Sequence, residues 1–281
     1  MKTFKQLSDG FSRLTRCLGI WENAGKNCTV LKTDTFLVSY PKSGNTWLRF
    51  LLAQYMTNQP LDFYTIEKVI PDIHENSDRK LLKIKNPRIL KSHQTYHSDY
   101  PRVIYIVRDP RDVAISFYYW QKKVGMLAKY GADFSLQDYL KHGFVESEKM
   151  GIISWAKHVD SWISHADVLG KHLLIIRYED IEKEPSNVLR KVIDFVGFNI
   201  DDVVINHAVN WSQADKMRQA EGVTAASIMP DRILKWLNKE RIPFVRKGKS
   251  GQWRDMFDAE LQNVYWTQFG KWMEQFGYEK K

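Results

Sequence analysis

The segment YPKSGNTW (residues 40–47) has the composition of a loop that binds an anion. It follows a short apolar run, residues 35–39, and leads directly into residues 48–55, whose apolar positions fit one face of a helix. A loop between a strand and a helix directs several backbone N–H groups at one point, and the helix dipole adds positive potential there. The segment therefore predicts a binding site for phosphate or a similar anion.

The order of residues in this loop differs from that of a Walker A loop. There the lysine follows the second glycine, whereas here Lys42 precedes Gly44 and is itself preceded by Pro41. The sequence also lacks an apolar strand that ends in a magnesium-binding acid. Asp109 ends an apolar run, but it lies in IVRDPRD, where Pro110 and two arginines indicate another task. A kinase-like P-loop enzyme is therefore disfavoured.

A second candidate anion site lies in IYIVRDPRDVAIS (residues 104–116). Arg108 closes a predicted strand, and Asp109 is suited to cap the helix that Pro110 opens. Ser116 lies two turns along that helix, so its hydroxyl and the planar guanidinium of Arg108 can bind one phosphate. The alternative is an Arg–Asp ion pair with Ser116 as a buried capping residue.

A third candidate lies in RKGKSGQW (residues 246–253). Cations beside a glycine turn expose backbone amides and positive charge together, which suits an anion. Alone this signal is weak, because basic glycine loops are common on protein surfaces.

Four short apolar runs predict the strands that must carry these loops: residues 35–39, 88–92, 103–107 and 172–177. Such runs are typical of parallel strands covered on both faces. Helix-length segments alternate with them, at residues 46–56, 111–121, 151–165 and 184–195, and helices and loops follow residue 200. This alternation predicts an α/β fold, a mostly parallel central sheet flanked by helices.

The whole chain, residues 1–281, is expected to form a single domain, because it contains no linker-like segment and no internal repeat. Residues 1–30 are expected to form a helical extension, since apolar residues recur there with helical spacing. Residues 122–149 are polar and punctuated by glycine, so they are either a lid over a pocket or a surface excursion.

The formal net charge of +9 attracts anions: nucleic acid, an anionic membrane or a phosphorylated small molecule. A nucleic-acid partner is not expected, because the aromatic residues are not interleaved with the basic runs. Stable membrane insertion is not expected either, since no run of about 18 apolar residues occurs. The two cysteines, Cys17 and Cys28, fit a reducing cytosol, and we expect a cytoplasmic location.

Taken together in this order, the three motifs resemble those of the PAPS-dependent sulfotransferases of the cytosolic type. PAPS, 3′-phosphoadenosine-5′-phosphosulfate, is the sulfuryl donor of that family, and PAP is its product. The resemblance spans residues 40 to 254 and implies a P-loop-like phosphosulfate-binding loop, a small-molecule acceptor and no metal. The cofactor-binding residues that it implies are Lys42, Ser43, Gly44, Asn45, Thr46, Trp47, Arg108, Ser116, Tyr178, Ser212, Met217, Arg246, Lys247 and Gly248.

The resemblance also implies catalytic roles. Lys91-Ser-His93 resembles the Lys-x-His that carries the family's general base, which makes His93 the expected base. Lys42 is expected to donate to the bridging oxygen as the nucleotide leaves, and Lys91 to stabilise the sulfuryl oxygens. His97, four residues after His93, invites a zinc site, but His93 ends a strand and no Glu follows it, so a metal is rejected.

The sequence departs from the family pattern at two places and leaves the acceptor open. The family's Gly-Asp-Trp-Lys is here Gly251-Gln-Trp-Arg254, and Ala214 stands where an aromatic is common. The dimerisation pattern of animal members is not evident, so the oligomeric state stays open. Loops 60–86, 122–150 and 220–245 are expected to build the acceptor pocket. Candidate lining residues are Phe63, Tyr64, Phe117, Tyr119, Met126 and Tyr130.

Two hypotheses from different classes follow. A sulfotransferase predicts sulfation of a hydroxyl or amine with His93 as the base. A nucleotide- or nucleic-acid-binding module without chemistry predicts binding to polyanions that is steeply salt-dependent and indifferent to His93. The order and spacing of the motifs favour the sulfotransferase.

Overall fold

The computed structural model describes residues 28–280, apart from residues 124, 132–133, 151 and 229–244. Its sheet contains β1 (Thr35–Ser39), β2 (Ile89–Ser92), β3 (Val103–Val107) and β4 (Leu173–Arg177). The strands are all parallel and lie in the order β2-β1-β3-β4. The predicted strands are confirmed, and two of them begin one residue later than expected, at Ile89 and Leu173.

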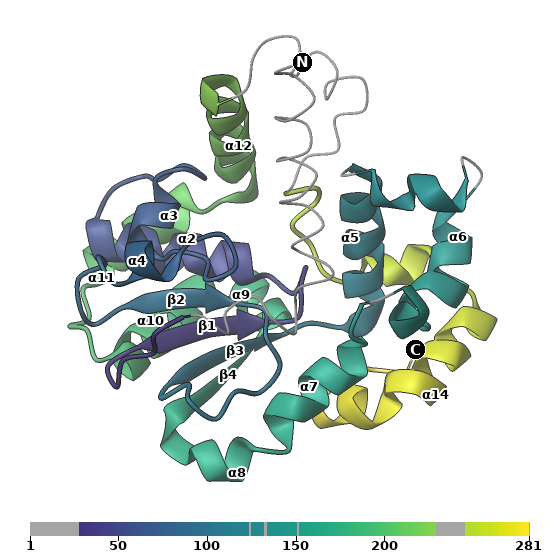
Figure 1. Cartoon of the computed structure of the whole chain (residues 1–281). Coiled ribbons are helices and arrows are strands. Elements are labelled where there is room, and N and C mark those ends of the chain that lie inside the picture. Colours follow the sequence, from purple (N-terminus) through teal and green to yellow (C-terminus); the bar gives the residue numbers. More distant parts are fainter. Residues whose placement is uncertain (1–27, 124, 132–133, 151, 229–244, 281) are drawn as a thin grey trace.

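Alternate residues of the strands point into two separate cores, one on each face of the sheet. Phe36, Val38 and Tyr105 belong to the first core, which α5 (Pro110–Lys123), α7 (Trp155–Ile163) and α14 (Ala259–Gln275) cover. Leu37 and Ile104 belong to the second, which α2 (Asn45–Thr57), α10 (Pro185–Val196) and α11 (Asp202–Trp211) cover. The result is a single α/β domain with helices on both faces of the sheet (Figure 1).

The local sequence explains where several helices begin and end. Asp109 accepts a hydrogen bond from the backbone N–H of Arg111, so it caps α5, and Pro110 occupies the first turn, as predicted. Pro185 likewise opens α10, which ends at Gly197 in the left-handed conformation. Short helices complete this part of the chain: α3 (Ile66–Val69), α4 (Asp78–Leu81), α8 (Ala166–Leu169), η4 (Gly170–His172) and α9 (Tyr178–Lys183).

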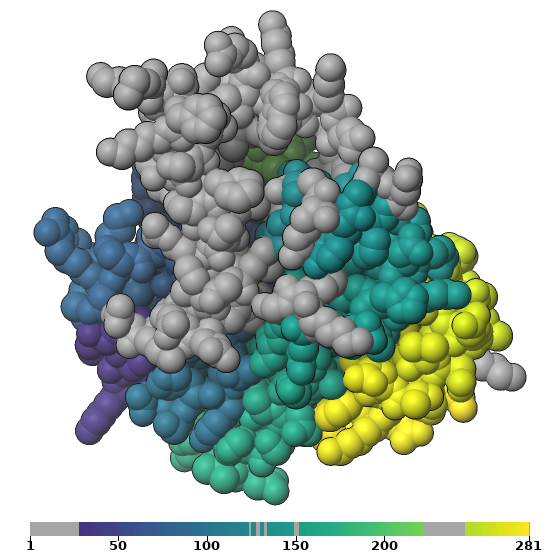
Figure 2. All heavy atoms as spheres, turned by 45° about the vertical axis from the view of Figure 1, so that its right-hand side comes forward, coloured from purple at the N-terminus to yellow at the C-terminus, as the bar shows by residue number. Residues whose placement is uncertain are grey.

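The described part of residues 122–150 contains short helical segments that pack into the fold. These are η1 (Met126–Tyr130), α6 (Leu136–Asp138), the π-helical η2 (Tyr139–Phe144) and η3 (Ser147–Met150). Tyr139, Leu140 and Phe144 are buried, and the ring of Phe144 stacks on that of Tyr265 in α14. Figure 2 shows the yellow surface of α14 against this teal segment. This stretch therefore contributes to the core, and a lid function stays a prediction.

The remaining described residues are helical or irregular, as expected after residue 200. They include α12 (Ala214–Ile228) and η6 (Gln252–Asp255). Most of the expected N-terminal extension lies outside the described residues. Within the described part of the chain, every helix is too short or too polar to cross a bilayer.

All four strands end at the same edge of the sheet, as parallel strands must. The chain leaves β1 into residues 40–44, β2 into His93, β3 into Arg108 and β4 into Tyr178. The loops that the sequence singled out as chemically capable therefore converge at this edge.

Candidate active site

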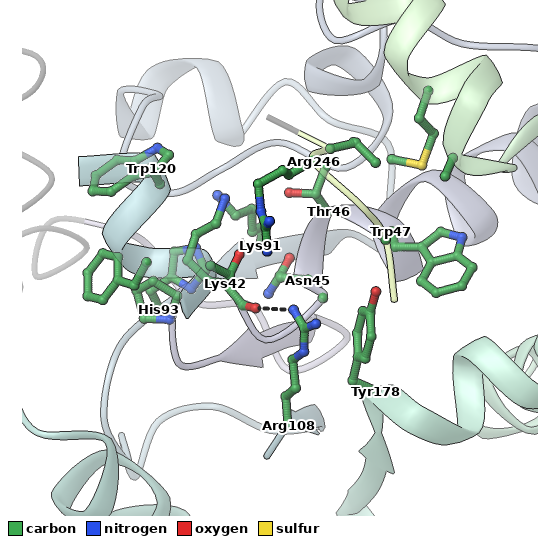
Figure 3. A pocket seen from close by; sticks show the side chains of 18 of the residues that line it. Lys42, Asn45, Thr46, Trp47, Lys91, His93, Arg108, Trp120, Tyr178 and Arg246 are labelled. Atoms are coloured by element: carbon green, nitrogen blue, oxygen red, sulfur yellow. Dashed lines mark hydrogen bonds between the residues drawn. The ribbon is translucent and has the colours of Figure 1, made fainter. Parts of the chain in front are cut away.

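A cavity of about 240 Å³ lies at the carboxyl edge of the sheet. Every predicted site residue except Ser43 lines it. Ser43, which lies in the loop between β1 and α2, is fully buried, and among the described residues its hydroxyl has no hydrogen-bond partner. Figure 3 shows Trp47 and Tyr178 at one end of the cavity and His93 and Trp120 at the other. The cavity thus has an aromatic end and an end that holds the predicted base.

The loop before α2 is held in an unusual backbone conformation. Lys42 has φ of 68° and Gly44 has φ of 99°, and for a non-glycine residue such as Lys42 the left-handed conformation costs about 1–3 kcal/mol. A Cβ on Gly44 would lie 2.4 Å from the ring of Tyr178, so glycine is required there. The side chain of Asn45 donates to the carbonyl of Leu37 and anchors the loop to β1.

The N-terminus of α2 is suited to an anion. Its N-cap residue is Gly44, so no side chain caps the helix, and its first turn contains no acidic residue. The first N–H groups of a helix lack intrahelical partners and carry the positive end of its dipole. Because the cavity borders residues 44–47, these groups lie beside the space in which an anion would bind.

Lys42 adds a titratable cation to the same loop. Burial and the nearby cations Lys123 and Arg108 lower the pKa of its ammonium group to about 7. An anion beside Lys42 would favour the charged form and raise this pKa again. The side chain is therefore poised to take up a proton when an anion enters the cavity.

Arg108 connects the first motif with the third. Its Nη1 donates to the main-chain oxygen of Lys42 at 3.1 Å, and its Nη2 donates to that of Lys249 at 3.0 Å. Its guanidinium lies 3.9 Å from the ring centroid of Tyr178. The buried Nε has no hydrogen-bond partner among the described residues, which leaves one donor for a ligand.

An Arg–Asp ion pair does occur in this motif, but it joins Asp109 to Arg111, whose Nη2 lies 2.7 Å from the carboxylate, and it does not include Arg108. Ser116 lines the cavity and is only partly buried. Arg108 and Ser116 therefore border the same space, as predicted.

The third motif is fastened by acidic residues of neighbouring helices. Asp112 of α5 accepts from the backbone N–H of Gly251 at 2.6 Å, and Glu182 of α9 accepts from that of Ser250 at 2.8 Å. Arg246 donates to the side-chain oxygen of Gln252, which replaces the usual Asp, and its guanidinium lies over the ring of Tyr119. The loop is thus fixed while Arg246 still borders the cavity.

The departure from the family pattern at Ala214 is compatible with the packing. A Cβ on Gly248 would lie 3.2 Å from that of Ala214, so the small side chain at position 214 lets the loop lie close. Ser212 lines the cavity beside Met217, and its hydroxyl accepts from Gln54 at 2.6 Å. The hydroxyl proton of Ser212 is then available to a ligand.

At the other end of the cavity, hydrogen bonds fix the tautomer of His93. Its Nδ1 lies 2.7 Å from the main-chain oxygen of Ser39. A carbonyl only accepts, so Nδ1 carries the proton and Nε2 carries a lone pair. Burial, with a further contribution from Lys91, holds the pKa of His93 well below its usual range. The imidazole is therefore a neutral base near pH 7.

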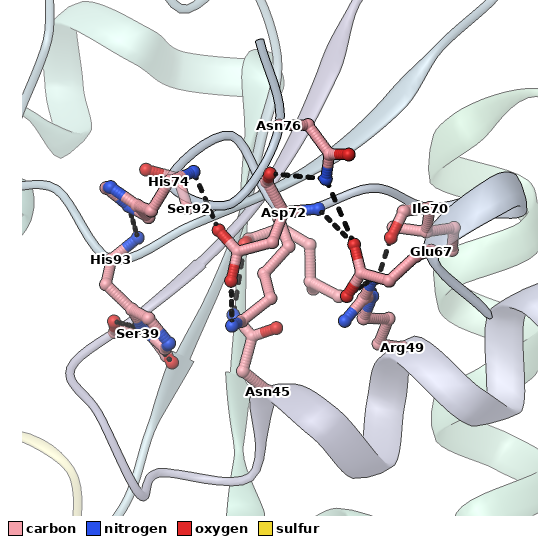
Figure 4. Close-up of polar contacts among 12 residues, drawn as sticks. Ser39, Asn45, Arg49, Glu67, Ile70, Asp72, His74, Asn76, Ser92 and His93 are labelled. Atoms are coloured by element: carbon pink, nitrogen blue, oxygen red, sulfur yellow. Dashed lines mark hydrogen bonds and ion pairs between the residues drawn. The ribbon is translucent and has the colours of Figure 1, made fainter. Parts of the chain in front are cut away.

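Lys91 forms an ion pair with Asp72, a residue that the sequence did not single out. Burial opposes ionisation of Asp72, but Lys91 and the nearby imidazoles hold the pKa of its carboxyl well below its usual range. The backbone N–H of Asp72 donates to Glu67, which pairs with Arg49 (Figure 4). The ion pair with Asp72 thus fixes Lys91 at the cavity wall.

Several lining residues were missed: Pro41, Asp72, His74, Glu75, Trp120, Val245 and Gln252. Of the aromatic residues predicted to line an acceptor site, Phe117 borders the cavity and the others do not. Phe63 packs on Phe50, and Tyr64 is 55% exposed on the surface. Among the described residues, no cluster of three His, Cys, Asp or Glu side chains could hold a metal ion.

The sequence of this chain matches a known protein family and is similar to characterised members of it. Residues 32–277 match the family described as the sulfotransferase domain. The 3-beta-hydroxysteroid sulfotransferase of Cavia porcellus is 29% identical over 247 residues, which cover 83% of this chain and 82% of that protein. Sulfotransferase 2A2 of Rattus norvegicus is 26% identical over 257 residues, with 88% and 86% covered.

Solved structures share the fold. Retinol dehydratase in a complex with retinol and PAP superposes with a TM-score of 0.65 at 19% identity, covering 93% of this chain and 86% of that one. Mouse sulfotransferase SULT7A1 complexed with PAP gives a TM-score of 0.64 at 22% identity, covering 92% and 93%.

Proposed function

Because this chain belongs to the sulfotransferase domain family, we propose that it transfers the sulfuryl group of PAPS to a hydroxyl or amine of a small-molecule acceptor and releases PAP. PAPS is anionic at two separate positions, the 5′-phosphosulfate and the 3′-phosphate. The cavity has two regions suited to anions, one at the start of α2 and one between Arg108, Ser116 and Arg246. This match of two anions to two regions supports the proposal.

The observation that carries the proposal is the position of Arg108. Arg108 donates hydrogen bonds to the main-chain oxygens of Lys42 and Lys249, which lie in the first and third motifs. Its buried Nε has no hydrogen-bond partner among the described residues. A buried guanidinium with such a donor is costly unless a ligand satisfies it. We assign the 3′-phosphate to Arg108, Ser116 and the loop 246–248, and the 5′-phosphosulfate to residues 42–46. Trp47 and Tyr178 flank the adenine.

Sulfuryl transfer needs a base for the acceptor proton, a charged hydrogen-bond donor for the leaving oxygen, and an acceptor aligned with the bond that breaks. The acceptor oxygen or nitrogen forms a bond to sulfur while the bond from sulfur to the bridging phosphate oxygen breaks, and PAP leaves with that electron pair. In-line attack places the acceptor opposite the leaving oxygen. The acceptor proton goes to Nε2 of His93, which the hydrogen bond to Ser39 leaves unprotonated. The ammonium of Lys42 donates to the leaving oxygen, and Lys91 stabilises the sulfuryl oxygens.

An apolar molecule with a hydroxyl group fits the acceptor end best. Phe117 and Trp120 line the cavity on the same helix as Ser116. One relative is named a 3-beta-hydroxysteroid sulfotransferase, and two structures of retinol dehydratase hold retinol and androsterone, respectively. Flat or elongated apolar alcohols would contact both aromatic rings. A cytoplasmic location stays a prediction.

The nucleotide site is tested by calorimetric titration with PAP. We expect tight binding to the wild type and loss of at least about 2 kcal/mol in Arg108→Ala, because charge-assisted hydrogen bonds contribute roughly 1.5–3 kcal/mol each. Arg190→Ala is the matched control, because Arg190 of α10 forms an exposed ion pair with Asp202 of α11. Failure of the wild type to bind PAP at low salt, or equal binding by Arg108→Ala, would contradict the proposal.

A further inference from the structure

Two other imidazoles hold the peptide groups of His93. The backbone N–H of His93 donates to Nε2 of His74 at 3.0 Å. The backbone oxygen of His93 lies 3.1 Å from Nε2 of His158. His93 is the first residue after β2, so sheet pairing no longer fixes its main chain. The two imidazoles therefore form the main-chain hydrogen bonds that neighbouring strands would form inside the sheet.

The chemistry of the partners determines which nitrogen of each ring is protonated. A backbone N–H only donates, so Nε2 of His74 accepts and its proton is on Nδ1. A carbonyl only accepts, so Nε2 of His158 donates, while its Nδ1 accepts from the hydroxyl of Tyr105 at 3.0 Å. Burial lowers the pKa of His74 and lowers that of His158 to about 4, so both rings stay neutral near pH 7.

His74 is itself held in place from several directions. The backbone N–H of His74 donates to Oδ1 of Asp72 at 2.9 Å (Figure 4). Asp72 also pairs with Lys91. The segment on which His74 lies runs parallel to the edge of β2. The backbone N–H of Lys91 donates to Pro71, and that of Ile73 donates to Lys91. These contacts therefore fix the distance between the imidazole of His74 and the backbone N–H of His93.

We propose that His74 is a positioning residue for the general base: by accepting the backbone N–H of His93 it fixes the direction in which Nε2 of His93 meets the acceptor. The proposal rests on the proposed function, in which His93 is the base. His74 lines the acceptor end of the cavity, and its ring lies parallel to that of His93, 13° between planes and 6.2 Å between centroids. A displacement of about 1 Å at a reacting group can cost roughly a hundredfold in rate.

Two substitutions distinguish this role from simple packing. In His74→Gln, the side-chain oxygen can occupy the position of Nε2 and accept the same N–H. In His74→Asn, the oxygen occupies the position of Nδ1 and cannot reach it. We expect His74→Asn to lose about 10- to 100-fold in kcat, which is the effect of roughly 1.4–2.8 kcal/mol, with unchanged affinity for PAP. We expect His74→Gln to stay within about threefold of the wild type.

The outcomes separate this proposal from the one on which it rests. His93→Ala is measured beside the two variants with PAPS and an accepted alcohol. If His93→Ala loses activity but His74→Asn matches the wild type, or if His74→Gln is as impaired as His74→Asn, the role of His74 is overturned and the base remains. If His93→Ala stays active, the proposed base fails and the role of His74 fails with it.

A second measurement does not depend on how the variants fold. In the wild type labelled with ¹⁵N-histidine, long-range ¹H–¹⁵N correlation spectra at pH 7 report the tautomer of each ring. We expect the proton on Nδ1 for His74 and His93, and on Nε2 for His158. A proton on Nε2 of His74 would exclude the hydrogen bond from His93 and overturn the proposal.

Discussion

Nη1 of Arg108 donates to the main-chain oxygen of Lys42 at 3.1 Å, although the two residues are 66 positions apart in the chain. The same guanidinium reaches Lys249 through Nη2. One side chain at the end of β3 therefore sets the distance between the loop after β1 and the basic loop near the C-terminus. The two regions that we assign to the two ends of PAPS depend on this single group for their spacing.

Arg108→Lys should weaken PAP binding about tenfold or more, although the charge is retained. A lysine ammonium cannot replace a planar guanidinium that spans two main-chain oxygens and still offers Nε to a phosphate. Calorimetric titration at fixed salt measures the loss. If Arg108→Lys bound PAP as tightly as the wild type, charge alone would suffice and the bridging role would be wrong.

Binding of PAP at pH 8 should be coupled to proton uptake by Lys42. The pKa of Lys42 is lowered to about 7 without a ligand, so the amine is mostly neutral at pH 8. The nucleotide's negative charge favours the ammonium and raises the pKa, so close to one proton should be taken up. Titrations in buffers of different ionisation enthalpy measure this uptake.

Two variants serve as controls for that prediction. Lys42→Met should show little uptake because the titrating group is gone. Lys123→Met should show reduced uptake, because Lys123 is the first of the neighbouring cations that lower the pKa of Lys42. Equal uptake by Lys42→Met and the wild type would assign the proton to another group.

The acid limb of kcat/KM should lie below pH 6.5. Burial and Lys91 hold the pKa of His93 well below its usual range, so the base keeps its lone pair as the pH falls through 6.5. Protonation of His93 should therefore not lower kcat/KM as the pH falls from 7 to 6.5. A limb centred at or above pH 6.5 would contradict the environment described for His93.

Gly44→Ala should lower both stability and PAP affinity. The new Cβ would meet the ring of Tyr178 at 2.4 Å in a left-handed backbone, and we expect a loss of about 2–3 kcal/mol in the free energy of unfolding. Gly197→Ala is the matched control, since Gly197 has φ of 82° but its Cβ would meet no heavy atom within 4 Å. It should lose about 1 kcal/mol and keep PAP affinity. Equal losses in both variants would argue against the contact with Tyr178.

Asp72→Asn should lower stability at pH 7 and change its dependence on acid. The pKa of Asp72 is depressed in the folded protein, so its contribution is present above the unfolded value of about 3.9 and is lost as the pH falls below it. The variant leaves Lys91 without its carboxylate, which should cost about 3 kcal/mol. Urea unfolding from pH 7 to pH 3 measures both effects, and Asp72→Asn/Lys91→Met should recover part of the loss. An unchanged acid dependence would refute the ion pair.

Local patterns in the sequence were sufficient to predict the four strands and the anion-binding loops, whereas most of the residues that line the cavity were implied by the resemblance to the sulfotransferase family. Strands buried on both faces require continuous apolar runs, and the loops after β1 and β3 carry residues whose types suit an anion. Residues 60–86 were expected to contribute to the acceptor pocket, but Asp72 and His74 were not singled out among them, because their segment reads as an ordinary polar loop. Its role arises from pairing with β2, about 19 residues later, which no local pattern records.

The acceptor end was predicted least well for a related reason. Aromatic composition does not reveal which face of a helix a ring occupies. On α5, Phe117 and Trp120 line the cavity, whereas Tyr119 lies beneath Arg246. Phe63 is partly buried and packs against the second core. Only the packed structure separates these environments.

The most direct test of the central claim is PAP release from PAPS in the presence of hydroxyl-bearing apolar acceptors, measured for the wild type and His93→Ala. We predict turnover by the wild type that depends on both PAPS and the acceptor, and a loss of at least about a hundredfold in His93→Ala with PAP binding unchanged. Turnover by His93→Ala at the rate of the wild type would contradict the account of His93 as the base.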